Sequence, residues 1–283
     1  MRKVLWILIL ISGIYADKGS IPFNANITIF EPNQRAVIAW NEKEEILIFT
    51  TDLHASDSTN VLEVIPLPSE PLVKKGDIEV FTRANKLINL KLHEGLKGRS
   101  EAIESAGEIT FHEKIGAHDI SVTRVLNKEK FIKWVQDYLK SAGVENPKIP
   151  EPMKEVIGEY LNENFTWFVF DVISLNKEIK TNEPIQYRFK TDFLYYPLKI
   201  TKVENGSTSI DLIILTPKLL SNFIGIPISQ VNLLHQPLSI TADELNFISK
   251  EVDSLLGHQN NMKLRIWRIQ GELSAFDNDL IVR

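Results

Sequence analysis

Short apolar segments, rich in β-branched residues, follow one another near the start of the chain. They span residues 27–30, 36–40, 46–51 and 61–65. Segments of this length and composition are typical of β-strands. Because polar turns separate the first three, we predict that they pair as an antiparallel meander. The proline-rich segment 66–71 cannot continue a central strand, since proline has no amide hydrogen to donate, and it is predicted to run along a sheet edge or out of the sheet.

Other segments place apolar residues at the spacing of an amphipathic helix. They lie at residues 80–88, 131–142 and 153–161. Asp77 and Asn127 precede the first two as N-caps, because their side chains can accept hydrogen bonds from free backbone N–H groups of a first turn. Thr241 and Glu244 have the spacing of a capping box, which opens a fourth helix predicted to run to Gly257.

The second half of the chain holds the remaining strand patterns. Residues 165–173 are apolar on both faces, as a central strand is, and residues 262–269 alternate as in a half-exposed strand. Alternation also predicts a strand at 185–189. Two hairpins are predicted, each from two neighbouring segments: 109–115 with 118–125, and 194–201 with 209–215 across the Asn205-Gly206 turn.

Strands and helices come in blocks instead of regular alternation, which indicates the α+β class. We therefore expect antiparallel sheets with packed amphipathic helices, in two subdomains. The expected divisions are a signal peptide at 1–16, an N-terminal β-meander plus helix at 17–93, a loop or linker at 94–108, and an α+β domain at 109–283.

The first residues have the layout of a secretory signal peptide. A basic start, Met1-Arg2-Lys3, precedes an apolar run over residues 4–15 and then Ala16. This run is too short to span a bilayer comfortably. Ile14, at the third position before the expected cut, keeps an uncleaved N-terminal anchor open as the alternative, and only then is membrane contact expected. The prediction is an extracytoplasmic protein, secreted or associated with the cell surface.

Composition narrows the partners and chemistries. The 283 residues carry 32 Lys and Arg against 37 Asp and Glu, and loss of Arg2 and Lys3 with the signal peptide changes the formal net charge from −5 to −7. An acidic chain without a basic run argues against nucleic acid as a partner. The absence of cysteine excludes thiol nucleophiles, disulfides and thiolate metal sites. Three sequons, at Asn26, Asn164 and Asn205, permit glycosylation only where the host has that machinery.

Motifs for known reactions are missing, and we predict no cofactor and no metal. The chain has no Gly-x-Ser-x-Gly elbow, and residues 95–100 lack the spacing of a phosphate-binding loop. His112, Glu113 and His118 form the most suggestive cluster, but strand periodicity places the two imidazoles on opposite faces of the sheet. His118 is therefore predicted to be a partly buried, hydrogen-bonded histidine at the edge of the core.

A second polar group, His54 with Asp57, lies at a strand end, where an ordinary polar loop is the simpler interpretation. Aromatic residues such as Trp134 and Trp167 lie on elements whose pattern indicates core packing. The candidate catalytic residues are His54, Asp57, His112, Glu113 and His118.

Several blocks together resemble one exported family, the uncharacterised family catalogued as domain of unknown function 2330. The blocks are residues 64–68, 113–122, 131–143, 167–169, 195–200 and 262–279. The resemblance implies an exported or membrane-tethered protein, often with a C-terminal hydrophobic anchor, which this chain lacks. It implies no activity, so no catalytic residue is carried over.

The sequence thus favours a non-catalytic exported protein that binds a protein or another component of the cell envelope. The alternative is an extracytoplasmic hydrolase, with or without metal assistance, that uses the histidine and carboxylate groups named above. A subunit of an envelope assembly is a third hypothesis, and it predicts a large exposed apolar patch.

Overall fold

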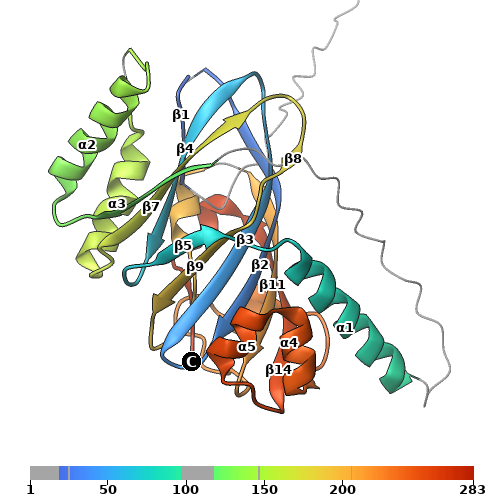
Figure 1. Cartoon of the computed structure of the whole chain (residues 1–283). Helices are drawn as coiled ribbons and strands as arrows, with labels where there is room; N and C mark the ends of the chain where they lie inside the picture. Colours follow the sequence, from blue (N-terminus) through green and yellow to red (C-terminus); the bar gives the residue numbers. More distant parts are fainter. Residues whose placement is uncertain (1–18, 25, 97–117, 146, 205) are drawn as a thin grey trace, which may run out of the picture.

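The computed structural model describes residues 19–24, 26–96, 118–145, 147–204 and 206–283, and they form the α+β fold that the sequence predicts (Figure 1). The larger sheet is mixed, because β11 runs parallel to β2 while the other neighbours are antiparallel. Its strands, in spatial order, are β12 (Val231–Leu233), β14 (Met262–Glu272), β11 (Ser207–Thr216), β2 (Ile29–Trp40), β3 (Glu44–Ala55), β9 (Ile185–Lys190) and β5 (Leu72–Lys75). Two short strands join it at the side, β13 (Leu238–Ile240) on β14 and β8 (Lys180–Thr181) on β3.

A smaller antiparallel sheet packs beside the large one. Its order is β1 (Gly19–Pro22), β4 (Thr59–Leu67), β7 (Trp167–Leu175) and β6 (Asp119–Arg124). A separate pair joins β10 (Leu194–Tyr196) to β15 (Leu280–Val282), near the end of the chain. Three 3-10 turns lie between strands: η1 (Lys199–Val203), η2 (Ile228–Gln230) and η3 (Leu273–Ala275).

Five helices in the described part cover the sheets on two sides (Figure 1). On one side, α2 (Lys128–Ser141) and α3 (Glu151–Asn162) pack into the core that the smaller sheet shares with the larger one. On the other, α1 (Glu79–Leu96), α4 (Ala242–Ile248) and α5 (Lys250–Leu256) pack on the outer face of the large sheet. None of the helices that the structure describes is long and apolar enough to cross a membrane.

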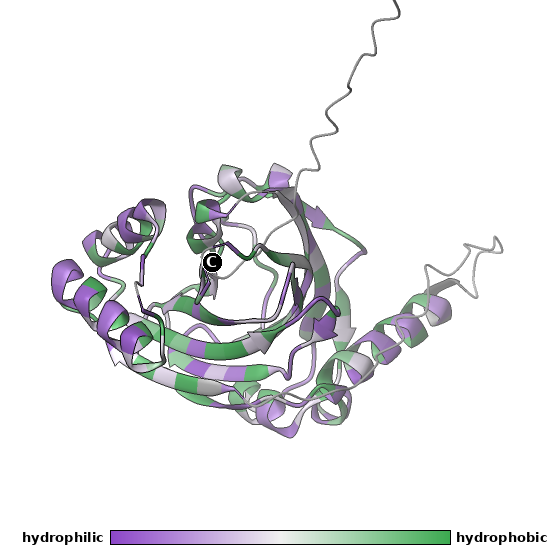
Figure 2. Ribbon diagram, turned by 90° about the horizontal axis from the view of Figure 1, so that it is seen from above, coloured by the Kyte–Doolittle hydropathy of each residue, from purple (hydrophilic) through white to green (hydrophobic). Residues whose placement is uncertain are grey.

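Alternation along the central strands explains why the large sheet is buried on both faces. In β2, Ala36 and Ile38 face the core shared with the small sheet, whereas Val37 and Ala39 face α4 and α5. All four are fully buried. Successive side chains of a strand point to opposite faces, so a continuous apolar run supplies both cores at once. Figure 2 shows the hydrophobic segments of the strands inside the two helix layers.

Most helix predictions are confirmed, with one correction. Asn127 caps α2 by accepting a hydrogen bond from Lys130 N, and Thr241 and Glu244 form the predicted capping box of α4. The helix predicted to run from there to Gly257 is two helices, however. Ser249 between them is extended, with φ −163°, and its side chain accepts a hydrogen bond from Val252 N to start α5. A serine in a helix interior competes for backbone hydrogen bonds, which is why the chain restarts there.

Strand predictions hold where burial dictates them and are wrong where pairing is long-range. Strands β2 and β3 pair antiparallel, and β7 lies centrally between β4 and β6, both as predicted. The turn predicted at residues 31–33 is wrong: residues 29–30 and 36–40 belong to one strand, β2, whose pairing with β3 is irregular between Phe30 and Asn33, so the meander has two strands and not three. The segment 61–65 lies in β4 of the other sheet. The hairpin predicted for 194–201 with 209–215 is wrong: β10 pairs with β15, and β11 pairs with β2 and β14.

Both sheets contain strands from the segments 17–93 and 109–283, and these segments also share the main core. The expected linker at 94–108 lies mostly outside the described residues, and so does the strand predicted at 109–115. The division into two subdomains stays a prediction.

Candidate functional site

The structure places His54 on β3, half-buried and stacked on another ring. Its ring centroid lies 4.6 Å from that of Phe30, with the planes inclined by 11°. Burial lowers the pKa of His54 below its usual value, and its buried Nδ1 has no hydrogen-bond partner within the described part of the chain. Asp57 is exposed in the turn after β3, where it accepts a hydrogen bond from Ser58 N and lies 3.9 Å from Lys177 Nζ.

His118 lies just before β6 and is held by a buried acid. Its Nδ1 is 2.5 Å from Oδ2 of Asp171 on β7, and the two side chains are 8% and 1% exposed. The prediction of a partly buried, hydrogen-bonded histidine is therefore confirmed. His112 and Glu113 lie outside the described residues. No three His, Asp or Glu side chains in the part of the chain that the structure covers are grouped as metal ligands, and a catalytic role for these residues stays a prediction.

Asp171 belongs to a buried polar cluster that the sequence interpretation missed. Glu63 on β4 lies directly opposite Asp171 in the strand register, and both are fully buried. Tyr187, from β9 of the large sheet, is near both carboxylates: burial raises its pKa well above the usual value, and their negative charges raise it further. The available signal was one acidic residue in each of two largely apolar strands.

A second buried cluster centres on Asp279, just before β15. Its Oδ1 accepts hydrogen bonds from Tyr160 Oη and Lys199 N, both at 2.8 Å, and its Oδ2 lies 3.1 Å from Tyr195 Oη. The Lys199 ammonium lies 4.2 Å from the Tyr160 ring centroid and 2.6 Å from a carboxylate oxygen of Glu163. The sequence interpretation did not single out Asp279, because nothing in the neighbouring residues shows that its side chain is buried.

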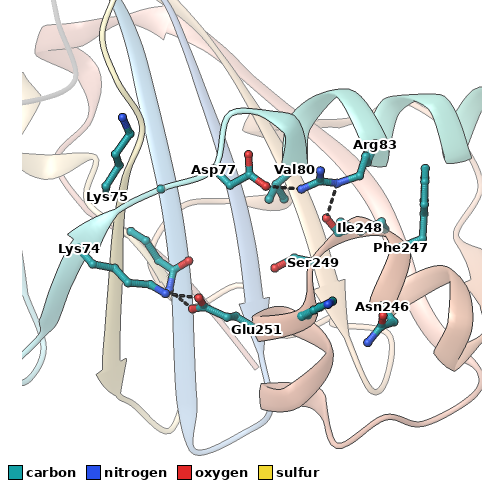
Figure 3. Close-up of a pocket in the computed structure, with 13 residues that line it drawn as sticks. Lys74, Lys75, Asp77, Val80, Arg83, Asn246, Phe247, Ile248, Ser249 and Glu251 are labelled. Carbon is teal, nitrogen blue, oxygen red and sulfur yellow. Dashed lines mark hydrogen bonds and ion pairs between the residues drawn. The ribbon is translucent and has the colours of Figure 1, made fainter. Parts of the chain in front are cut away.

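One concave surface in the described part of the chain is a groove of about 640 Å³ on the outer face of the large sheet, which we call the β5–α5 groove (Figure 3). It lies where β5 leads into α1 and where α4 gives way to α5. Its lining residues are Lys74, Lys75, Gly76, Asp77, Val80, Arg83, Gln186, Asn246, Phe247, Ile248, Ser249, Lys250 and Glu251.

Ion pairs organise the polar lining of the β5–α5 groove. Lys74 pairs with Glu251, whose other oxygen accepts a hydrogen bond of 2.8 Å from Gln186. These two hydrogen bonds lower the pKa of Glu251. Arg83 connects the two sides of the groove, since it pairs with Asp77 and donates from Nε to the Ile248 carbonyl oxygen at 2.9 Å (Figure 3).

Other lining side chains are directed elsewhere or remain exposed. Lys75 points away from Glu251 and pairs with Glu183 at 2.7 Å (Figure 3). The Ser249 hydroxyl is used as the cap of α5. Lys250 is exposed, and the Phe247 ring remains 49% exposed beside these charges.

Comparison with known proteins gives a family but no activity. The model of a family described as an uncharacterised protein conserved in bacteria, DUF2330, matches residues 16–221. The chain belongs to this family. The DUF2330 match includes β5 and all of α1 but ends before α4 and α5, so one side of the β5–α5 groove lies within it and the other beyond it. It also ends before residues 262–279, the last block of the sequence resemblance.

Two further comparisons add little to the DUF2330 assignment. Among solved structures, the crystal structure of baculovirus P35 resembles 93% of this chain over 99% of its own, with a TM-score of 0.45 and 9% sequence identity. No curated protein matches the sequence.

Proposed function

We propose that the protein is exported and acts by binding, without catalysis, and that the β5–α5 groove holds a segment of its partner. The observation that carries the proposal is the surplus of hydrogen-bond donors in the groove. Four cationic side chains and two carboxylates line it. The four cations are Lys74, Lys75, Arg83 and Lys250.

Ammonium and guanidinium groups donate hydrogen bonds and accept none. Each carboxylate of the groove already has a cation, Asp77 with Arg83 and Glu251 with Lys74. Donors therefore remain on several cations, and above all on exposed Lys250. A partner segment rich in acceptors, such as carboxylates and exposed carbonyl oxygens, fits this chemistry, while Phe247 offers an apolar contact.

The chemistry of the groove favours binding over catalysis. Both of its carboxylates are already paired with cations, and its one hydroxyl, on Ser249, caps a helix. Exposed ion pairs contribute only about 0.2–1 kcal/mol each, so a partner can replace them at low cost. Export rests on the basic start, the apolar run and Ala16, which predict that residues 1–16 are removed.

The test is site-specific photocrosslinking in the bacterial host. A photoreactive residue replaces Lys250 in the full chain, and in a second protein it replaces exposed Lys133 of α2. We expect an adduct from position 250 and none from 133, on a protein whose N-terminus begins after residue 16 by mass spectrometry. The substitution Lys74→Glu should weaken the adduct at least about fivefold, since one favourable charge contact becomes repulsive. The exposed Lys218→Glu control should leave it unchanged. Equal adduct yields at both positions would reject the groove as the binding site. An adduct yield at position 250 that Lys74→Glu leaves unchanged would reject it too.

A further inference from the structure

The last strand that the structure describes, β15, is held by backbone pairing, by the buried side chains of Leu280 and Val282, and by one buried carboxyl group next to it. Strand β15 has three residues, which pair with residues 194–196 of β10. On its other side, Ile224 N donates to the Ile281 carbonyl oxygen at 2.8 Å, and Arg283 N donates to the Asn222 carbonyl oxygen at 3.0 Å. Asp279 precedes this strand directly, and its carboxyl group connects it to α3, β10 and η1.

The hydrogen bonds around Asp279 can form in two arrangements. The Tyr195 hydroxyl has one hydrogen but two acceptors at 3.1 Å, Asp279 Oδ2 and the Pro66 carbonyl oxygen. When Asp279 is ionised, the Tyr195 hydrogen is needed at Oδ2. When Asp279 carries a proton on Oδ2, that proton is donated to the Tyr195 oxygen, and Tyr195 donates to Pro66. In both states Oδ1 still accepts from Tyr160 and Lys199 N. The protonated state therefore makes one more hydrogen bond in a fully buried place.

Charged and titratable groups surround this carboxyl from every packed element. Burial raises the pKa of Asp279 to about 6, against the Lys199 backbone bond, the Tyr160 hydroxyl and the Lys199 ammonium, which lower it. A carboxylate oxygen of Glu163, on α3, accepts a hydrogen bond of 2.6 Å from the Lys199 ammonium. Glu45 on β3 accepts a hydrogen bond from Tyr195 N at 2.7 Å, and burial raises its pKa also.

We propose that Asp279 is a proton-operated latch, which closes the C-terminal strand β15 onto the core when protonated and loosens it when ionised. This device is independent of the β5–α5 groove. Opening of β15 exposes the carboxyl to water, where it ionises freely, so each rise in pH favours the open form.

The direction of the effect follows from linkage. Burial holds the pKa of Asp279 at about 6 in the closed state, above its ordinary value of 3.8. The latch is therefore fully effective below about pH 4 and loses its effect as the pH rises through about 6. Between pH 5 and 7.5 the equilibrium constant for the opening of β15 should rise about tenfold. The reason is that Asp279 titrates near pH 6 in the closed form and near pH 4 in the open form, which is about its ordinary value.

Amide hydrogen exchange of the whole protein tests the proposal at the residues concerned. After correction for intrinsic rates, protection of the Leu280–Val282 amides should fall about tenfold from pH 5 to 7.5. In Asp279→Asn the side-chain amide can donate to Tyr195 as the protonated acid does, so protection should hardly change with pH. Glu204→Gln is the matched control: burial raises the pKa of Glu204 to about 7, yet this side chain bonds Ser20 N and not the latch. It should keep the pH dependence of β15.

The same pH dependence in Asp279→Asn as in the wild type would overturn the latch, and so would its loss in Glu204→Gln alone. If Asp279→Asn does not fold, titration of the ¹³C-labelled Asp279 carboxyl in the wild-type chain decides. A midpoint near 6 with a parallel loss of β15 protection supports the latch, and a midpoint below 5 rejects it.

Discussion

A Cβ atom on Gly225 would lie 1.8 Å from the carbonyl oxygen of Asp279. No real contact is this short, and the atom in the way is backbone, which cannot rotate aside. The loop that contains Gly225 and the segment that leads into β15 are thus in direct backbone contact, and glycine is required there for space.

Gly225→Ala should therefore destabilise the protein by at least about 2–3 kcal/mol, because the added methyl group forces the two backbones apart. Urea denaturation followed by circular dichroism measures the change. A cost below 0.5 kcal/mol, within the scatter typical of surface substitutions, would show that the loop moves freely, contrary to the packing described above.

Gly158→Ala is the matched glycine-to-alanine substitution, and it is expected to raise the folding stability instead of lowering it. Gly158 lies inside α3, and its added Cβ would meet only the far end of the Lys128 side chain, at 3.2–3.5 Å. Alanine is favoured over glycine in a helix interior by about 0.5–1 kcal/mol, so the same denaturation assay should show a gain of about that size. A loss would mean that Lys128 cannot move.

His118→Ala should cost about 2–4 kcal/mol of folding stability, because it leaves the buried Asp171 carboxylate without its partner at 2.5 Å. His258→Ala is the comparison, since His258 also bonds an acid, Asp253, at 2.8 Å. Asp253 keeps a hydrogen bond of 2.8 Å from Asn246, so a smaller loss is expected. Equal losses for the two variants would contradict the account of the buried cluster.

His54→Phe should remove a sensitivity to acid. Burial lowers the pKa of His54, so the folded state resists its protonation. The stability this provides is present above the unfolded pKa near 6.5 and is lost as the pH falls through the lower folded value. Phenylalanine keeps the stacking on Phe30. The variant should thus match the wild type at pH 8 and exceed it at pH 5 in thermal melts. An unchanged difference between the two pH values would contradict this.

Local signals in the sequence predict the local structure well. The cap residues Asn127 and Thr241 mark the starts of α2 and α4, and the doubly apolar run at 165–173 gives the central strand β7. These features depend on neighbouring residues alone, whose hydrogen-bonding and burial preferences are visible in the order of amino acids.

Partners in the sheets are not predicted in this way. A glycine turn at Asn205-Gly206 indicates a hairpin, yet β10 pairs with β15 and β11 pairs with β2, because burial of both faces of the large sheet outweighs the local turn preference. The buried polar clusters cannot be predicted from the sequence for the same reason. Glu63 and Asp171 lie far apart in the sequence, as do Tyr160 and Asp279, and only the fold brings them together.

The parallel pairing of β2 with β11 has a consequence for how the chain folds. Residues 33–39 must find residues 209–215, and β14 must then add to β11 from still later in the sequence. Contacts between residues so far apart in the sequence form slowly. During synthesis the early strands therefore remain unpaired until the later strands have been made. The large sheet can be completed only after β14, which ends at Glu272, has been made, so we expect folding of this sheet to be a late event in synthesis.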